Sequence, residues 1–152
     1  MTIKEEKRDL FTMPEDYALA HCISADFALG AGIAKEFDKR FNCRKRLLGL
    51  NFNSVKEWDC KNKKGDCIVT GFYDPYLIFN LVTKQNYWHK PTFETIENAL
   101  TVMKDQCEFL GIKKVAMPKI ACGLDGKQWS DVKPLIEKVF ADTDIEIVVC
   151  SL

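Results

Sequence analysis

The sequence predicts an α/β fold in which one compact mixed β-sheet is flanked by helices. The first observation is that short apolar runs alternate along the chain with segments whose apolar residues recur at helical spacing. The second is the composition, since 47% of the residues are hydrophobic and 29% are charged, as expected for a packed core with a solvated surface. The third is the length of 152 residues, which suits a single domain over residues 1–152.

The first part of the chain predicts a strand, a glycine turn and two helices. Tyr17–Ser24 (YALAHCIS) is a short, mostly apolar run that indicates a buried strand. The turn at Gly30–Ala34 leads into a helix over Lys35–Phe41, whose two phenylalanines share one face. Arg44–Leu50 has the pattern of another short helix, and Asn51–Gly65 is polar with a turn at its lysine-rich end.

A hairpin and a long helix are predicted next. The strands Asp66–Tyr73 and Tyr76–Thr83 flank a turn at Asp74-Pro75, and the second strand is rich in β-favouring side chains. Thr92–Leu110 is the clearest helix of the chain, because Thr92 can cap its start and Gly111 can end it.

The last part of the chain predicts two strands separated by a helix. Val115–Met117 is a brief buried strand that runs into a loop. The helix begins at Ser130 or Asp131, so that Pro134 falls in the first turn, where its missing N–H costs no hydrogen bond. Ile145–Leu152 (IEIVVCSL) closes the chain as a strand.

The charge balance and the cysteines argue against several classes of protein. Lys and Arg number 22 and Asp and Glu number 22, whereas a protein that depends on binding nucleic acid carries a basic excess. The apolar runs are all shorter than the roughly 20 residues that cross a bilayer, and residues 1–9 lack a signal-peptide core. The seven cysteines are scattered and form no CxxC pair. We therefore expect an intracellular, soluble protein with reduced thiols, no membrane contact and no bound metal.

Two glycine-bearing segments are candidate phosphate-binding loops. Leu29–Ala34 (LGAGIA) follows a predicted strand and opens a helix, so its backbone N–H groups could bind a phosphate. It is not a dinucleotide fingerprint, because Lys35 stands where the third glycine would be. Met117–Asp125 follows another strand and carries a carboxylate at its tip. Together the loops would form a crevice for a diphosphate, although tight packing and a turn-forming role for Asp125 are the alternatives.

Lys84 is the candidate nucleophile. It follows the second strand of the predicted hairpin, where a lysine either ends the strand in solvent or, if desolvated, has a lowered pKa and attacks an electrophilic carbon. We expect His21 and His89 to pack or to form hydrogen bonds, because no third and fourth metal ligand accompany them.

A series of short motifs runs in order across nearly the whole chain: Asp9–Phe11, Leu19–Ser24, Gly30–Ala34, Val82–Lys84, His89–Thr92, Met117–Pro118, Cys122–Asp125 and Gln128–Trp129. With these motifs the chain resembles the macrodomain family, and within it the members that release ADP-ribose from proteins and deacetylate O-acetyl-ADP-ribose. The resemblance implies a mixed β-sheet sandwiched between α-helices, with ADP-ribose in a cleft at the strand ends.

The resemblance also implies which residues bind the ligand. Two residues after an implied first strand lie near the adenine: Asp9 and Leu10. The residues that line the ribose and diphosphate are Ser24, Gly30, Ala31, Gly32 and Ile33. The residues that wrap the diphosphate and the distal ribose are Lys119, Ile120, Ala121, Cys122, Gly123 and Leu124. Leu152 is a further candidate ligand-binding residue.

The catalytic pair that the resemblance implies is Lys84 and Asp125. Lys84 would attack the anomeric carbon of the distal ribose and expel a carboxylate, while Asp125 would transfer protons as general acid and base. No metal or cofactor is implied. The chain departs from the family pattern at Arg8, Lys119 and Ala121, and at Cys150, where an aromatic residue would stack on the adenine. These departures concern affinity more than catalysis.

Two alternatives to a hydrolase remain from the sequence. A reader macrodomain would bind ADP-ribose and not cleave it, but it would have no need of the Lys84–Asp125 pair. A nucleic-acid-associated factor would use the basic residues Arg44–Arg46 and Lys61–Lys64. The partners implied by the resemblance are ADP-ribose, ADP-ribosylated proteins and ADP-ribosylated nucleic acid. We expect a monomer that acts in the nucleus and the cytoplasm, in ADP-ribosylation reversal and the DNA damage response.

Overall fold

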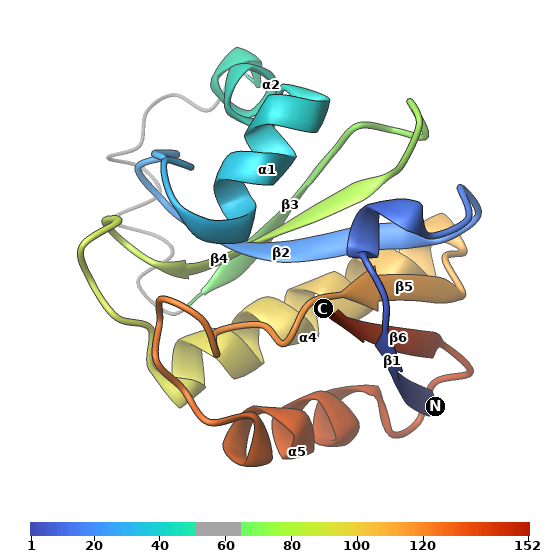
Figure 1. The fold of residues 1–152 in the computed structure, drawn as a ribbon. Helices are drawn as coiled ribbons and strands as arrows, with labels where there is room; N and C mark the ends of the chain where they lie inside the picture. Colours follow the sequence, from blue (N-terminus) through green and yellow to red (C-terminus); the bar gives the residue numbers. More distant parts are fainter. Residues whose placement is uncertain (51–64) are drawn as a thin grey trace.

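The computed structural model describes residues 1–50 and 65–152, so the predicted polar segment with its turn at Lys61–Gly65 lies almost wholly outside the described residues. The described strands form a single mixed sheet in the order β1-β6-β5-β2-β4-β3 (Figure 1). The strands are β1 (Thr2–Lys7), β2 (Ala18–Ser24), β3 (Asp66–Thr70), β4 (Ile78–Lys84), β5 (Lys114–Met117) and β6 (Glu146–Ser151). Neighbouring strands pair in parallel, except that β3 runs antiparallel to β4.

Helices cover both faces of the sheet, which confirms the predicted mixed sheet between helices (Figure 1). One face packs against α4 (Phe93–Leu110) and α5 (Trp129–Phe140). The other face packs against α1 (Gly32–Phe41), α2 (Cys43–Gly49) and the short 3₁₀ helix η1 (Leu10–Thr12). No helix of the described ranges is long and apolar enough to cross a membrane.

The continuous apolar run of β4 follows from this layering. Phe79 and Leu81 belong to the core beneath α4, whereas Ile78 and Val82 belong to the core beneath α1. Because successive side chains of a strand point to opposite faces, a strand covered on both sides needs apolar residues at nearly every position.

The long helix α4 begins and ends as its sequence predicts. The Thr92 hydroxyl accepts a hydrogen bond from the Thr95 backbone N–H at 3.1 Å, and the Thr95 hydroxyl accepts one from the Thr92 N–H at 3.0 Å. At the other end, Gly111 adopts a φ of 70°, a left-handed conformation that glycine adopts readily at the end of a helix. The two signals therefore fix both ends of α4.

The last helix differs from the prediction. It begins at Trp129 with Gln128 as its N-cap, so Pro134 lies in the second turn instead of the first. A proline there removes the hydrogen bond that its N–H would donate to Ser130. The helix continues nevertheless, because Val132, Ile136 and Phe140 are all fully buried, and their packing offsets the lost bond.

Two strands also differ from the analysis of the residues alone. That analysis assigned no element to the charged segment Thr2–Lys7, which forms β1 at the edge of the sheet, where charged side chains are tolerated. The predicted hairpin strands do pair, but β3 ends at Thr70. Gly71, Phe72 and Tyr73 have φ values of 82°, 42° and 69°, and this left-handed backbone cannot continue the β-ladder.

A buried polar network links the middle of the sheet. Asn80 of β4 donates from Nδ2 to the Ile68 carbonyl at 3.0 Å and to the Thr70 hydroxyl at 2.9 Å. Its Oδ1 lies 2.6 Å from His21 Nε2 of β2, so His21 Nε2 carries the hydrogen and donates it. The His21 ring also stacks on Phe37 at a centroid distance of 3.8 Å. His21 is therefore a neutral packing residue, as the sequence predicts.

We expect this histidine to make the protein less stable in acid. Burial lowers the pKa of His21 to about 4 from its ordinary 6.5. Between these values the unfolded chain takes up a proton that the folded chain does not. Stability is thus lost as the pH falls from 6.5 to 4, by about 3 kcal/mol at most. Urea unfolding across this pH range should show the loss in the wild type and a smaller one in His21→Gln; equal losses in both would contradict the prediction.

Candidate functional site

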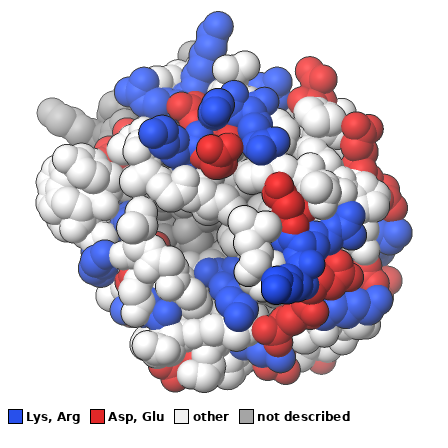
Figure 2. All heavy atoms as spheres, viewed as in Figure 1, with Lys and Arg blue, Asp and Glu red and all other residues white. Residues whose placement is uncertain are grey.

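A cavity of about 780 Å³ opens beyond the carboxyl ends of β2, β4 and β5. Its walls are the loop after β2 with the start of α1, the residues after β4, and the loop after β5. The surface is hollowed in this region between α1 and the loop after β5 (Figure 2). The carboxyl ends of parallel strands are the usual place for a ligand in α/β sheets, so this cavity is the candidate site.

Lys84 and Asp125 meet inside the cavity. Lys84 is the last residue of β4, and Asp125 lies in the loop after β5. Lys84 Nζ is 2.7 Å from Asp125 Oδ1, and their side chains are only 15% and 12% exposed. The pair is therefore within proton-transfer distance and largely shielded from bulk water.

Cys22 also lines the cavity, but it is not placed to act as a nucleophile. Burial, followed by the negative charge of Asp125, raises the pKa of the Cys22 thiol to about 12. The thiol is therefore protonated at neutral pH, and a protonated thiol is a poor nucleophile. Lys84, by contrast, has the carboxylate of Asp125 beside it in the same wall.

The start of α1 forms part of the cavity wall. Gly30 to Ala34 line the wall, and no side chain caps the helix at Ala31. The first N–H groups of a helix have no partner within the helix, and the helix dipole makes this end attractive to anions. The first turn also holds no acidic residue. This wall can therefore bind a phosphate.

Gly32 fits between the two glycine-bearing loops because it has no side chain. Its φ is 59°, and a Cβ at this position would lie 3.2 Å from the Leu124 side chain. Leu124 is 66% exposed and belongs to the loop after β5. The loop after β2 and the loop after β5 thus approach each other at Gly32, next to the cavity.

We expect Gly32→Ala to destabilise the fold by about 1 kcal/mol, because the left-handed backbone is unfavourable for a residue with a Cβ. Alanine also lowers the conformational entropy of the unfolded chain, but this gain offsets only part of the strain. Gly30→Ala is the matched control, because its Cβ would meet nothing closer than 3.8 Å and its φ is not left-handed. Urea unfolding compares the two variants. Equal free energies of unfolding in the two variants would show that position 32 does not require glycine.

The loop after β5 is shaped by its own backbone hydrogen bonds. The Cys122 N–H donates to the Lys119 carbonyl at 3.2 Å, and the Lys127 N–H donates to the Ala121 carbonyl at 2.9 Å. Ala121 itself adopts a left-handed φ of 60°. A residue with a Cβ is strained in this conformation, which glycine would adopt without that cost.

Most residues that the sequence singled out lie together in the cavity wall. They are Ser24, Gly30, Ala31, Gly32, Ile33, Lys84, Lys119, Ile120, Ala121, Gly123, Leu124 and Asp125. Four others do not line it. Asp9 caps η1 by accepting a bond from the Phe11 N–H, and Leu10 is buried in the core. Cys122 is half-buried in the loop after β5, and Leu152 is 93% exposed.

Other cavity residues were not individually given a binding or catalytic role from the sequence. They are Cys22, Ile23, Ala28, Leu29, Ala34, Tyr87, Lys90 and Pro118. Several of them lie inside or directly beside the motifs of the sequence, so proximity to a motif was the signal. Lys90 lies in the His89–Thr92 motif, whereas Tyr87 carried no such signal, because its place in the wall depends on how the chain turns after β4.

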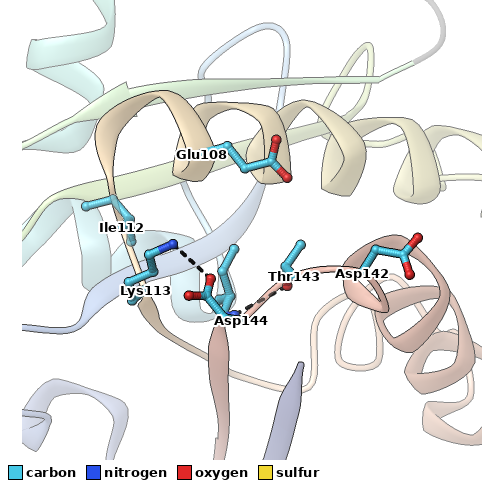
Figure 3. A pocket seen from close by; sticks show the side chains of 7 residues that line it. Glu108, Ile112, Lys113, Asp142, Thr143 and Asp144 are labelled. Atoms are coloured by element: carbon cyan, nitrogen blue, oxygen red, sulfur yellow. Dashed lines mark hydrogen bonds and ion pairs between the residues drawn. The ribbon is translucent and has the colours of Figure 1, made fainter.

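A second, smaller cavity lies at the opposite end of the strands, next to the amino ends of β5 and β6. Its volume is about 360 Å³, and Glu108, Lys113 and Asp144 line it (Figure 3). Lys113 Nζ lies 2.8 Å from Asp144 Oδ1, but these side chains are 60% and 75% exposed. This pair is a solvated ion pair, and such pairs contribute little to the free energy of folding. Among the described side chains, no group of three or more metal-ligating residues converges.

The charged surface gives little support to nucleic-acid binding. The face in Figure 2 carries Lys and Arg side chains interspersed with Asp and Glu. Arg44 donates to the Phe27 carbonyl at 3.0 Å, and Arg46 lies 3.9 Å from the Asp74 carboxylate. These arginines therefore have partners within the protein. Lys61–Lys64 lie outside the described residues.

Comparison with known proteins shows that most of the chain is similar to one family. The family model described as Macro domain matches residues 20–136. ADP-ribose glycohydrolase OARD1 of Homo sapiens is 40% identical over 146 residues, which cover 96% of this chain and 89% of that protein.

Solved structures share the fold at lower identity. The macrodomain of Mycobacterium tuberculosis DarG superposes with a TM-score of 0.79 and 24% identity, covering 99% of this chain and 98% of that chain. Thermosipho africanus DarTG in complex with ADP-ribose superposes with a TM-score of 0.77 and 18% identity, covering 99% of this chain and 42% of that one.

Proposed function

The chain belongs to the macrodomain family, and on this basis we propose that it is an ADP-ribose hydrolase. It removes mono- or terminal ADP-ribose from Glu- and Asp-linked protein esters, and it deacylates O-acetyl-ADP-ribose. The observation that carries the proposal is the Lys84–Asp125 pair, whose 2.7 Å contact lies within the cavity. The name of the human relative, ADP-ribose glycohydrolase, supports the same activity.

The walls of the cavity suggest how ADP-ribose lies in it. The diphosphate contacts the N–H groups at the start of α1 and the backbone of the loop after β5, where an anion is favoured. The distal ribose then lies at the end of the cavity that holds Lys84 and Asp125. Lys119, which also lines the wall, adds a positive charge that helps to retain the diphosphate.

In the first chemical step, Asp125 Oδ1 takes a proton from Lys84 Nζ, and the freed amine attacks the anomeric carbon of the distal ribose. The bond from that carbon to the ester oxygen breaks, and the Glu or Asp carboxylate leaves with the electron pair. The attached nitrogen then loses one proton to the departed carboxylate and another to the ring oxygen as the ring C–O bond at the anomeric carbon breaks, which gives an open-chain lysyl–sugar imine. Water then adds to the imine, and Asp125 returns its proton to the nitrogen. The bond between the nitrogen and the sugar breaks, so that ADP-ribose is released and the Lys84 amine is regenerated.

This chemistry favours ester linkages. A carboxylate is a stable leaving group, so it departs without protonation, whereas an amide or an N-glycoside needs a stronger acid. In O-acetyl-ADP-ribose the acetyl group can migrate between neighbouring hydroxyls of the same ribose. When it is on the anomeric oxygen, attack by Lys84 breaks the bond from the anomeric carbon to that oxygen, and acetate leaves as the protein carboxylate does. We therefore propose ADP-ribosylated proteins as partners, and ADP-ribosylated nucleic acid as an additional substrate. Action in the nucleus and the cytoplasm, as part of ADP-ribosylation reversal after DNA damage, belongs to the same proposal.

The experiment that tests the function incubates the purified protein with O-acetyl-ADP-ribose and with a Glu/Asp-ADP-ribosylated protein. Chromatography of the products detects free ADP-ribose and acetate, and calorimetry measures the affinity for ADP-ribose. Turnover of either substrate supports a hydrolase. Tight binding of ADP-ribose without turnover would leave a reader and reject the enzyme.

A further inference from the structure

The turn formed by residues 86–90 connects the loops around the catalytic pair, and we propose that Asp26 and Lys90 position Lys84 against Asp125 through this turn. The inference rests on the proposed function, since it concerns the same pair. Asp26 and Lys90 are positioning residues: each binds a backbone group next to a catalytic residue and takes no part in the chemistry.

The sheet by itself does not bring Lys84 and Asp125 together. Lys84 ends β4 and Asp125 follows β5, and β2 lies between these two strands. Strands two places apart are about 10 Å from each other. The 2.7 Å contact is therefore set by the segments beyond the strand ends, and those segments must be held in place.

Asp26 holds the segment that carries Lys84. One carboxylate oxygen accepts hydrogen bonds from the Ser24 hydroxyl and from the Ala28 N–H at 3.1 Å, and the other accepts one from the Tyr87 N–H at 3.0 Å. The backbone adds two bonds, from the Ala25 N–H to the Lys84 carbonyl at 2.9 Å and from the Asp26 N–H to the Gln85 carbonyl at 3.2 Å. The chain from residue 84 to residue 87 is thus fixed to the loop after β2.

That loop has a shape that its sequence does not favour. Phe27 and Leu29 have left-handed φ values of 53° and 43°, which are unfavourable for residues with a Cβ. Both side chains are buried, and Arg44 Nε donates to the Phe27 carbonyl at 3.0 Å. A backbone of this kind persists where surrounding contacts hold it, and the Asp26 carboxylate supplies such contacts in the centre of the loop.

Lys90 holds the segment that carries Asp125. Its Nζ donates a hydrogen bond to the Leu124 carbonyl, the peptide group next to Asp125. The turn between the two anchors is closed by its own bonds, from the His89 N–H to the Asn86 carbonyl at 3.0 Å and from the Asn86 N–H to His89 Nδ1 at 3.2 Å. Asp26 and Lys90 therefore act on the two ends of one connected unit.

The test compares Asp26→Asn, Lys90→Met, Lys90→Arg and the double variant Asp26→Asn/Lys90→Met with the wild type, all as the full chain. Asparagine keeps an oxygen for Ser24 and Ala28 and turns an N–H₂ group toward the Tyr87 N–H, so it breaks that bond selectively. Asp16→Asn and Lys114→Met are the matched controls, because they break an exposed ion pair of 2.9 Å outside the cavity.

Two readouts are expected to move together. Steady-state hydrolysis of O-acetyl-ADP-ribose should lose kcat by on the order of 100-fold in Asp26→Asn and 10-fold in Lys90→Met. KM and the Kd of ADP-ribose should be nearly unchanged in Asp26→Asn and should rise by less than the loss of kcat in Lys90→Met, because the Lys90 charge lines the cavity. Lys90→Arg should restore kcat, and the double variant should lose less than the product of the single losses. The acylation rate of Lys84 by an amine-reactive reagent, followed by mass spectrometry, should rise in the same variants, since Asp125 shields Lys84 Nζ.

The acylation readout needs no turnover, so it separates this inference from the proposed function. An inactive wild type would reject the function, and the Lys84 acylation rates would still decide the positioning. Unchanged acylation in Asp26→Asn and Lys90→Met would overturn the inference. So would a rise in KM and Kd with kcat unchanged, or the same kcat loss in Lys90→Arg as in Lys90→Met.

Discussion

Replacement of Lys84 by methionine or alanine is expected to lower the hydrolysis of O-acetyl-ADP-ribose by about 1,000-fold or more, because the nucleophile of the proposed reaction is removed. Methionine keeps an unbranched apolar side chain of similar length, so it preserves the packing around a group that is only 15% exposed. The affinity for ADP-ribose should stay within the range of the wild type, since the start of α1 and the loop after β5 are untouched.

Two measurements check this prediction. Product formation under saturating substrate gives the loss of kcat, with Lys113→Ala as the matched control, because Lys113 forms a lysine–aspartate pair of 2.8 Å outside the candidate cavity. Borohydride reduction during turnover should convert the lysyl–sugar imine into a stable amine on Lys84, detectable in a peptide digest. A Lys84 variant with full activity, or a trapped sugar on a different residue, would refute the assigned role.

Asp125→Asn is expected to lower kcat by about 100- to 10,000-fold, the usual contribution of a general acid or base. Asparagine has nearly the shape of aspartate but cannot accept the Lys84 proton across the 2.7 Å contact. The first proton transfer and the hydrolysis of the imine should both slow. Binding of ADP-ribose should change less than turnover.

The measurement for Asp125 is a comparison of the burst and steady-state phases. If imine hydrolysis slows more than its formation, the variant should accumulate reducible adduct on Lys84 that the wild type does not. Asp144→Asn, in the exposed pair of the smaller cavity, is the control for the loss of one carboxylate. A rate equal to that of the wild type would remove Asp125 from the mechanism.

The strands and helices that the sequence predicts well are those whose signals are local. Thr92 begins α4 through its capping hydrogen bonds, and Gly111 ends it by adopting a left-handed φ. Each signal acts within one turn of the helix, so neighbouring residues are enough to predict the helix ends. The run Leu77–Val82 indicates a strand that is covered on both faces, because every side chain in it except that of Asn80 is apolar. By contrast, β1 has the composition of a solvated segment and is a strand only because β6 pairs with it.

The residues of the candidate site divide in the same way. The glycine turn, the loop after β5, Lys84 and Asp125 could be named from motifs, since each motif is a short stretch of chain. Tyr87 and Asp26 lie outside the motifs, and the His89–Thr92 motif gave Lys90 no role. Their importance arises from contacts between segments 34 to 61 positions apart in the sequence, such as Lys90 with Leu124 and Asp26 with Tyr87, and no local pattern records a contact of that kind.

The sequence by itself determined the α/β class and most helices and strands, because periodicity and capping act over a few residues. Its resemblance to the macrodomain family then named the candidate catalytic pair. Only the tertiary structure decided that Lys84 and Asp125 meet at 2.7 Å, that Cys22 lies beside them as a protonated thiol, and that Asp9 and Leu152 lie away from the cavity wall. The physical reason is the strand order: β2 separates the strands that carry the pair, so their distance depends on how three loops pack against one another.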